Sequence, residues 1–310
     1  MKQNKTYYVI LTSILILTFA IRLLGINQPF NEDELHWAHS ATVRDWFGTV
    51  TFNTPLSIYF LNAFTAIFGV SVETIRLTFV IISIATIIVT AIFAKQQCGE
   101  RTALFAALLL AINPLHVLAS LQAAYEGSVL TLFFVTTLLF LSRNKTSLTS
   151  IAFGLAILSK SSALFIIPPI IFAYLFMIHR KFIESLKQTT IITLIASLPF
   201  IIFFALPSII LQSPALINSI VKLFSPQAAS SIGIVSLIIQ YGYALMWLGP
   251  IFTFLPLLAW TTKKKHQIHF IAVITTILFY FILTRNTTPP IERYWMILLP
   301  SLAIISAQQI

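Results

Sequence analysis

Apolar runs separated by short polar connections extend along the whole chain. Runs long enough to cross roughly 30 Å of hydrocarbon recur along its whole length, and the first two lie at about 7–26 and about 75–94. Further runs, two of them noticeably short, lie at about 102–119, 127–142, 147–159, 163–178, 188–211, 234–260, 268–284 and 294–310. The pattern predicts an all-α polytopic membrane protein with about ten transmembrane helices.

One further apolar run, about 55–70, is unlike the others. It has only about 16 residues, begins at Pro55 and contains Asn62, which is short for a membrane span. We interpret it as an interfacial or re-entrant helix. The first outer loop, 27–72, is therefore expected to carry interfacial helices at the membrane surface.

The composition supports the membrane interpretation. Hydrophobic residues make up 58% of the chain and charged residues 9%, whereas a soluble domain carries about 25% charged residues. We expect a single integral-membrane domain over 1–310 and no soluble C-terminal domain. The one cysteine, Cys98, excludes an internal disulfide, and no cysteine–histidine motif indicates zinc.

The net charge of +10 would also suit a nucleic-acid-binding protein, but its distribution argues against one. The basic residues lie in small groups between apolar runs, the arrangement that keeps loops cytoplasmic. These groups are Lys2/Lys5, Lys95/Arg101, Arg143/Lys145, Arg180/Lys181/Lys187 and Lys263/Lys264/Lys265. With the amino terminus inside, the first helix then delivers the loop from about residue 27 to the extracytoplasmic side.

That first outer loop concentrates acidic side chains. Three of the nine acidic residues stand together in "PFNEDELHWA", as Glu32, Asp33 and Glu34. They could simply keep a solvated loop out of lipid. The pattern from Asp33 to Phe47, however, is helical, with Trp37, Ala41, Arg44 and Phe47 at helical spacing, which would hold the acids at the membrane surface. Crowded carboxylates beside lipid raise one another's pKa, which suits a general base.

Other ionisable residues are expected on the same face. Glu126 is an isolated acid between two spans; it could stabilise a helix start through the helix dipole or belong to a functional site. Lys160, Arg285 and Arg293 are outward cations, against the positive-inside trend. They could snorkel or pair locally, or they could bind an anionic headgroup.

His36 and His39, spaced i, i+3 beside Asp33, could complete a divalent-metal site. The alternative is that both are ordinary interfacial polar side chains. We favour the latter and assign no metal site, although a divalent cation could still take part.

Several segments in order resemble a known family: "FNEDELHWAHSA", "NTPLSIYFLNAFTAIFGVSVETIRL", "NPLHVLASLQAAYEGSVLTLFF", "GLAILSKSSALFIIP" and "ERYWMILLPSLAII". Together they are similar to GT-C glycosyltransferases of the protein-mannosyltransferase and aminoarabinose-transferase type. The resemblance implies an inverting transferase that takes sugar from a polyprenyl-phosphate donor at the outer leaflet of the plasma or inner membrane. The acceptor would be a lipid, a glycan or a protein, and nucleic acid is not a partner.

The resemblance also implies roles for particular residues. Asp33 and Glu34 match the family's Asp-Glu pair, with Asp33 as base, and Glu126 matches the acid of the second outer loop. The residues matched to donor-phosphate binding are Lys160, Arg285, Arg293, Tyr294 and His36. His36 stands where relatives often have arginine, and Thr54-Pro55-Leu56 replaces a Lys-Pro-Pro-like element. Relatives usually carry further spans and an extracytoplasmic domain.

The sequence thus predicts a membrane glycosyltransferase that works on the extracytoplasmic face. The main alternative is a transporter or flippase of an amphiphilic substrate, which would also place charges within the membrane. That class of protein usually shows inverted repeats and matching broken spans, and the sequence has no internal repeat.

Overall fold

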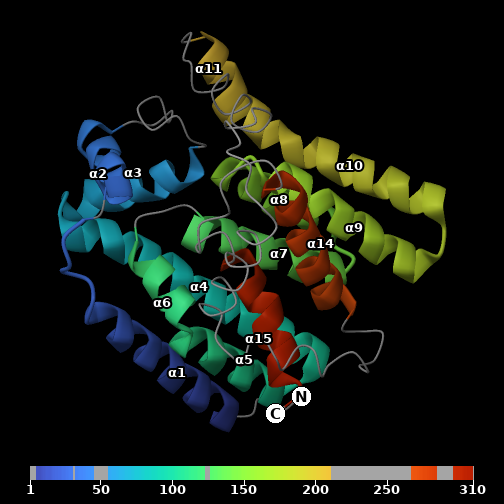
Figure 1. Cartoon of the computed structure of the whole chain (residues 1–310), viewed down its shortest axis with the longest axis horizontal. Helices are drawn as coiled ribbons and strands as arrows, with labels where there is room; N and C mark the ends of the chain where they lie inside the picture. Colours follow the sequence, from blue (N-terminus) through green and yellow to red (C-terminus); the bar gives the residue numbers. More distant parts are fainter. Residues whose placement is uncertain are drawn as a thin grey trace.

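The computed structural model describes residues 5–30, 32–44, 55–122, 126–210, 267–284 and 296–309. These residues form helices and short connections, with no strand among them. The elements are α1 (Lys5–Leu23), α2 (Glu32–Val43), α3 (Leu56–Phe68), α4 (Val72–Cys98), α5 (Glu100–Ile112), α6 (Pro114–Leu121), the π-helix η1 (Glu126–Leu130), α7 (Thr131–Ser142), α8 (Thr146–Ser159), α9 (Ala163–His179), α10 (Phe182–Phe200), the π-helix η2 (Ile201–Ala205), α11 (Leu206–Ile210), α14 (Gln267–Thr284) and α15 (Leu299–Ala307). Figure 1 shows their arrangement.

Helix α4 forms the centre of the bundle, and its sequence explains its limits. The Ser71 side chain accepts a hydrogen bond from the Thr74 N–H at 3.1 Å, which caps the first turn. The helix ends at Gly99, whose φ of 97° lies in a region that glycine tolerates without strain. Of its most apolar window, 61% is buried, compared with 22% for α1. The β-branched run of α4 is therefore buried on most sides by protein.

Two apolar clusters hold the helices together. The larger one joins buried side chains of α1, α4, α5, α6, η1, α7, α8, α9, α10, α14 and α15. The smaller one joins α2, α3, the first half of α4, η1 and the end of α8. We call the part of the molecule built around the smaller cluster the α2–α3 end.

Polar contacts gather several helix ends at the opposite end of the molecule. Lys95, near the end of α4, pairs with Glu100 of α5 at 3.0 Å and lies 4.0 Å from the ring centroid of Tyr7 in α1. Arg143, just after α7, donates to Gln96, and Gln308, just after α15, donates to the Cys98 sulfur at 2.8 Å. In Figure 1 both chain termini lie at this end, away from α2 and α3.

This arrangement agrees with the alternation predicted from the basic groups. The end of α1 and the start of α4 meet at the α2–α3 end, where Arg76 bonds the carbonyl oxygens of Gly25 and Ile26. The start of α1 and the ends of α4, α7 and α15 meet at the other. Successive long helices therefore run in opposite directions among the described residues.

The described helices match most of the predicted runs, with three differences. Helix α2 ends at Val43, because Arg44 adopts a left-handed φ of 51°, so the helix predicted to reach Phe47 stops earlier. The predicted run 102–119 is two helices, α5 and α6, that meet at a bend of 59°. The run predicted to start at 188 begins at Phe182. The predicted run 234–260 lies outside the described residues.

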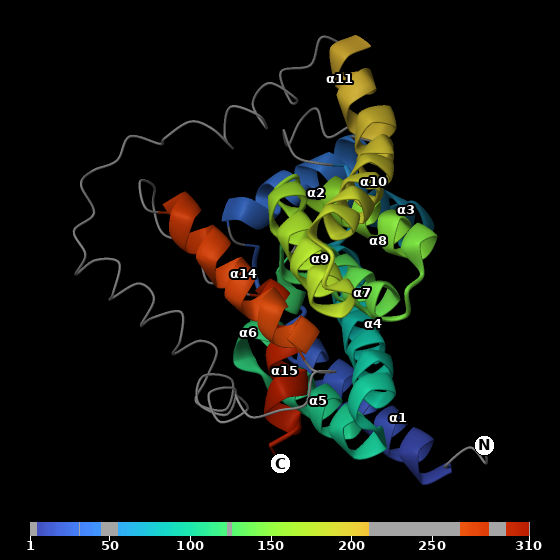
Figure 2. The same ribbon diagram turned by 90° about the vertical axis from the view of Figure 1, so that its right-hand side faces the viewer.

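The count of about ten spans stays a prediction. Among the described residues, three helices are long and apolar enough to cross a membrane alone: α1, α4 and the helical stretch Phe182–Phe203. The bent pair α5–α6 would be a fourth, and the remaining apolar helices have 10–17 residues. Figure 2 shows α1, α10 and α14 at the periphery of the bundle.

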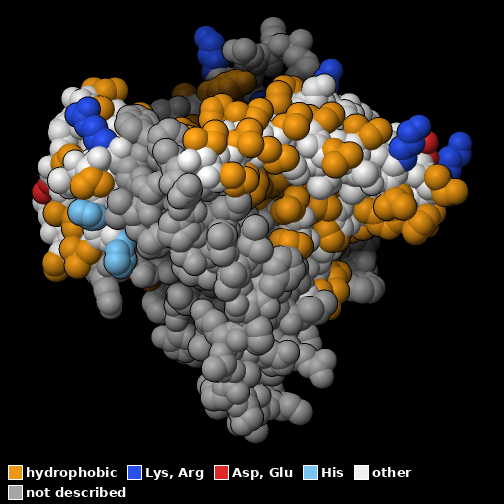
Figure 3. All heavy atoms as spheres, turned by 90° about the horizontal axis from the view of Figure 1, so that it is seen from above, with side chains coloured by type: hydrophobic (Ala, Val, Ile, Leu, Met, Phe, Trp, Pro, Cys, Tyr) orange, Lys and Arg blue, Asp and Glu red, His pale blue; other side chains and the backbone are white. Residues whose placement is uncertain are grey.

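Part of the outer surface of the bundle is apolar. Figure 3 shows a broad area of hydrophobic side chains. Large exposed hydrophobic residues recur on α1 and α10, including Ile16, Leu17, Ile183, Leu194 and Leu198. Since such continuous apolar surface is rare on soluble monomers, these faces suit contact with lipid.

Candidate active site at the α2–α3 end

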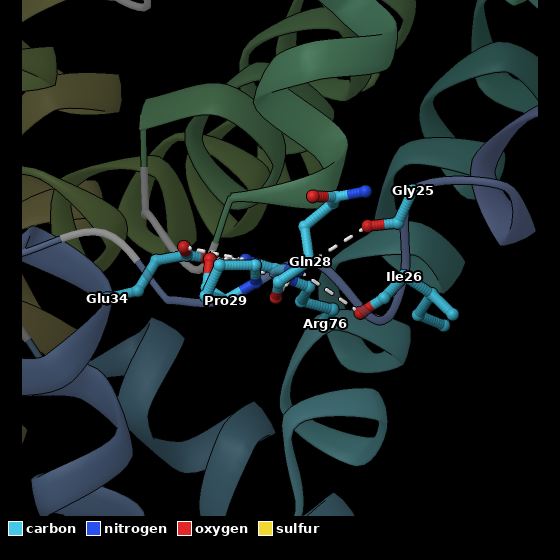
Figure 4. Close-up of polar contacts among 6 residues, drawn as sticks. All are labelled: Gly25, Ile26, Gln28, Pro29, Glu34 and Arg76. Atoms are coloured by element: carbon cyan, nitrogen blue, oxygen red, sulfur yellow. Dashed lines mark hydrogen bonds and ion pairs between the residues drawn. The ribbon is translucent and has the colours of Figure 1, made fainter.

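The loop between α1 and α2 is held by one buried arginine. Arg76, in the second turn of α4, donates from its Nη1 atom to the carbonyl oxygens of Gly25 (3.4 Å), Ile26 (3.1 Å) and Gln28, and from Nη2 to that of Pro29 (3.0 Å). Figure 4 shows these carbonyl groups converging on the guanidinium. An open loop in or near lipid needs such partners, because its carbonyl groups have no water to bind.

The same guanidinium binds the acidic stretch that follows the loop. Its Nε and Nη2 atoms donate to the two carboxylate oxygens of Glu34 at 3.1 and 2.9 Å, a two-pronged contact (Figure 4). Both side chains are almost completely buried, with 5% and 2% of their surface exposed. Glu34 is therefore neutralised by Arg76, and the start of α2 is tied to α4.

Asp33 immediately precedes Glu34 in the first turn of α2. Its side chain lies outside the part of the chain that the structure describes, but the position of its backbone follows from the helix. Trp37 and Ala41, four and eight residues later, are 4% and 1% exposed, and the Trp37 ring packs edge-on against Phe79 of α4 at 6.2 Å. Asp33 lies one helical turn before Trp37 in α2, so its backbone is held by the same packing.

The smaller apolar cluster brings three distant segments to one place. It contains Trp37 of α2, Val129 of η1 and Leu158 of α8, each buried. Asp33 precedes Trp37 by four residues, Glu126 precedes Val129 by three, and Lys160 follows Leu158 by two. The cluster therefore draws together the backbone segments that carry two predicted acids and one predicted cation.

Local structure at two of these segments is irregular. Glu126 is the first residue of η1, a π-helix, and its side chain is outside the described part. Such single π turns often occur at functional sites. Lys160 ends α8 in an extended conformation, with its N–H bonded to the Ala156 carbonyl oxygen at 3.0 Å, and its side chain is half-buried.

The two histidines considered as metal ligands, His36 and His39, form no metal site with the other described residues. His36 and His39 lie exposed on α2, and no group of three or more described histidine, cysteine or acidic side chains could hold a metal ion. Three of the predicted phosphate-binding residues, Arg285, Arg293 and Tyr294, lie outside the described residues, so their positions stay predictions.

Sequence analysis missed two buried arginines. Arg76 organises the first loop as described above, and Arg22, at the end of α1, is fully buried. Both lie within or next to apolar runs, where ionisable side chains are expensive and usually have a task. This signal was available in the sequence, because Arg22 lies inside the first apolar run and Arg76 close to the start of the next full-length one.

The fold is that of GT-C membrane glycosyltransferases. The structure is similar to ArnT from Cupriavidus metallidurans bound to undecaprenyl phosphate, with a TM-score of 0.75 and 14% identity over 96% of this chain and 59% of that chain. It is also similar to the oligosaccharyltransferase AglB from Archaeoglobus fulgidus in complex with an inhibitory peptide and a dolichol-phosphate, with a TM-score of 0.62 and 13% identity over 97% of this chain and 50% of that one.

The sequence itself identifies the family. Residues 53–210, slightly more than half of the chain, match the model of the dolichyl-phosphate-mannose-protein mannosyltransferases, and the chain belongs to this family. No curated protein sequence matches it. The chain spans less than two thirds of the length of the solved structures described above.

Proposed function

We propose that this protein is a glycosyltransferase that moves a sugar from a polyprenyl-phosphate donor to an acceptor on the extracytoplasmic face of the cell membrane. The family and the fold support this class of reaction. The observation that carries the proposal is the smaller apolar cluster, around which the segments bearing Asp33, Glu126 and Lys160 converge. The acceptor would be a lipid, a glycan or a protein.

The donor proposal rests on charge and on the relatives. A leaving lipid phosphate gains negative charge as its bond to the sugar breaks, so cations at that position lower the barrier. Lys160 stands at the α2–α3 end, and we assign Arg285, Arg293, Tyr294 and His36 to the same phosphate. The structure of ArnT contains undecaprenyl phosphate and that of AglB contains a dolichol-phosphate. Both are polyprenyl phosphates, the class of leaving group proposed for this chain.

The proposed reaction is a single displacement. Asp33 accepts the proton of the acceptor hydroxyl or amine while the acceptor atom attacks the anomeric carbon. The bond from that carbon to the phosphate oxygen breaks on the opposite face, and polyprenyl phosphate leaves. One displacement inverts the anomeric configuration.

The two other acids of the candidate site receive different roles. Glu34 is bound to Arg76 through both carboxylate oxygens, so we assign it to positioning Asp33 rather than to proton transfer. Glu126 is proposed to orient the acceptor from the second outer loop.

The test is turnover in membranes supplied with a panel of undecaprenyl-phosphate-linked sugars. Mass spectrometry would measure the released undecaprenyl phosphate and the glycosylated product. Asp33→Asn should lower turnover by about 10²–10⁴-fold, the usual contribution of a general base, while donor binding persists. Glu126→Gln should lower it less, and Glu34→Gln least of the three.

Glu32→Gln is the matched control, because it removes the same charge one residue away and should leave turnover nearly normal. Near-normal turnover in Asp33→Asn together with loss in Glu34→Gln would move the base by one residue. Full activity in the Asp33, Glu34 and Glu126 variants would contradict the proposed mechanism. Movement of the lipid across the membrane without release of sugar would favour a flippase instead.

A further inference from the structure

A second buried arginine, outside the residues discussed as catalytic, joins the two halves of the broken span α5–α6. Arg22 is 0% exposed near the end of α1. Its Nη1 atom donates to the carbonyl oxygen of Ala111 in α5 at 3.3 Å, and its Nη2 atom lies 2.8 Å from Nδ1 of His116 in α6. One guanidinium therefore contacts both sides of the 59° bend.

The break itself explains why a cation is useful there. Asn113 has an extended ψ of 123°, which ends α5 and frees the last carbonyl groups of that helix. The side chain of Asn113 then caps α6 by accepting the N–H of His116 at 3.0 Å. A positive charge at the carboxyl end of α5 is favoured by the helix dipole, and its hydrogen bond satisfies the freed carbonyl of Ala111.

The direction of the Arg22–His116 bond follows from the chemistry of the donor. An arginine side chain can only donate, so His116 accepts at Nδ1 and carries its proton on Nε2. His116 is also 0% exposed. The pair is thus a neutral imidazole bound to a buried cation that has no carboxylate partner among the described side chains.

Burying a cation without a counter-charge is costly. Among the described residues, Arg22 bonds helices α5 and α6 instead of a carboxylate. Helix α6 ends at Leu121, and Glu126 begins η1 a few residues later. Helix α6 also packs directly against η1, so whatever orients α6 bears on the segment that begins with Glu126. Arg76 ties the segment bearing Asp33 to α4 in the same manner, so each outer acidic segment has its own arginine.

We propose that Arg22 and His116 are positioning residues that set the angle of the broken span and thereby place Glu126 in the active site. The predicted effect on turnover rests on the proposed transferase function. The anchoring of α6 by Arg22 and His116 does not, and it can be tested separately. Arg22 and His116 would act through α6 and touch neither substrate.

The structural arm of the test is hydrogen–deuterium exchange of the purified protein, followed on peptides covering residues 113–130. His116→Leu removes the acceptor of the Arg22 bond, whereas His116→Asn keeps an acceptor atom near the position of Nδ1. Faster exchange of these peptides is expected in His116→Leu and in Arg22→Gln, with nearly normal exchange in His116→Asn. Ser120→Ala is the matched control, because among the described residues its hydroxyl bonds only the Val117 carbonyl of the same helix.

The kinetic arm measures turnover and the apparent KM for the undecaprenyl-phosphate sugar. A misplaced catalytic segment can cost about 10²-fold in rate, so His116→Leu should lower kcat by that order with little change in KM. His116→Asn should recover most of the loss. Unchanged exchange in both Arg22→Gln and His116→Leu would overturn the anchor.

Faster exchange with an unchanged kcat would overturn the positioning role. Equal losses in His116→Asn and His116→Leu would overturn the assignment of the acceptor at Nδ1. A wild-type protein without transferase activity would contradict the proposed function, while the exchange measurements would still decide the anchor.

Discussion

At the scale of single residues, the first outer loop depends on the shape of one side chain. Arg76 has five N–H groups in a rigid fork, and its Nε, Nη1 and Nη2 atoms all donate, to four backbone carbonyls and to Glu34. The guanidinium also lies over the Phe30 ring at 5.4 Å. A lysine could carry the charge but could not bind both carboxylate oxygens and the loop.

The two members of this ion pair should differ when replaced. Arg76→Gln leaves a buried carboxylate and several loop carbonyls without their donor, so we expect a loss of about 3–5 kcal/mol in stability. Glu34→Gln keeps an acceptor oxygen and leaves the bonds from Arg76 to the carbonyls, so its loss should be smaller. Unfolding in detergent, followed by the circular dichroism of the helices, measures both.

Arg44→Gln is the control for this comparison, because Arg44 is exposed at the end of α2. Its effect should stay within about 0.5 kcal/mol, as for most surface substitutions. A larger loss in Glu34→Gln than in Arg76→Gln would show that the carboxylate, not the loop, is the main partner of Arg76.

At the scale of elements, the close packing of α8 against α10 positions the end of α8, which Lys160 follows. Helix α8, which ends at Lys160, packs against α10 at Gly154. A Cβ atom added to Gly154 would lie 2.8 Å from the Ala196 carbonyl oxygen and 3.1 Å from the Pro199 ring. The absence of a side chain at Gly154 therefore lets the two helices approach.

Gly154→Ala should separate α8 from α10 and destabilise the protein by about 1–3 kcal/mol, the usual cost of overpacking. Gly25→Ala is the matched control: its Cβ would meet only the end of the Leu121 side chain, at 2.7 Å, which can rotate away. Thermal unfolding in detergent compares the two variants. Equal losses would mean that the backbone contact at Ala196 does not limit the packing.

At the scale of the whole molecule, the described helix ends fall into two groups, and the basic connections that the structure describes between α4 and α5 and between α7 and α8 lie with one of them. Cys98, between Lys95 and Arg101, is the last residue of α4, and α4 ends at the end of the molecule opposite α2 and α3. The positive-inside rule assigns that end to the cytoplasm. The α2–α3 end, with the candidate active site, would then face outward.

The orientation can be tested with a membrane-impermeant maleimide on intact cells. Cys98 should stay unlabelled until the membrane is permeabilised. In a Cys98→Ser background, Asn27→Cys should be labelled in intact cells, and Ser147→Cys only after permeabilisation. Asn27 and Ser147 are both exposed, so burial does not explain a difference between them. The reverse labelling pattern would invert the molecule and place the candidate site on the cytoplasmic side.

The elements were largely predictable from the apolar runs. The runs expected at 147–159 and 163–178 are α8 (Thr146–Ser159) and α9 (Ala163–His179), and the run at 268–284 is α14. The bend between α5 and α6 was not predicted, because α6 is as apolar as a continued span, although Asn113 and Pro114 are strong helix-stop signals. The residues of the candidate site were predictable as a set that shares the outer face. The packing of α2, η1 and α8 in the smaller apolar cluster, which brings their segments together, was not predictable.

The sequence by itself determined the membrane class, the family, the position of most helices and the loop that concentrates the acids. These properties depend on composition, periodicity and short motifs, which are local in the chain. Only the tertiary structure decided which arginine binds which segment, since Arg76 reaches Glu34 from 42 residues away and Arg22 reaches His116 from 94. Such contacts depend on how α1, α4 and α6 pack, and packing across the bundle satisfies polar groups that lipid leaves without partners.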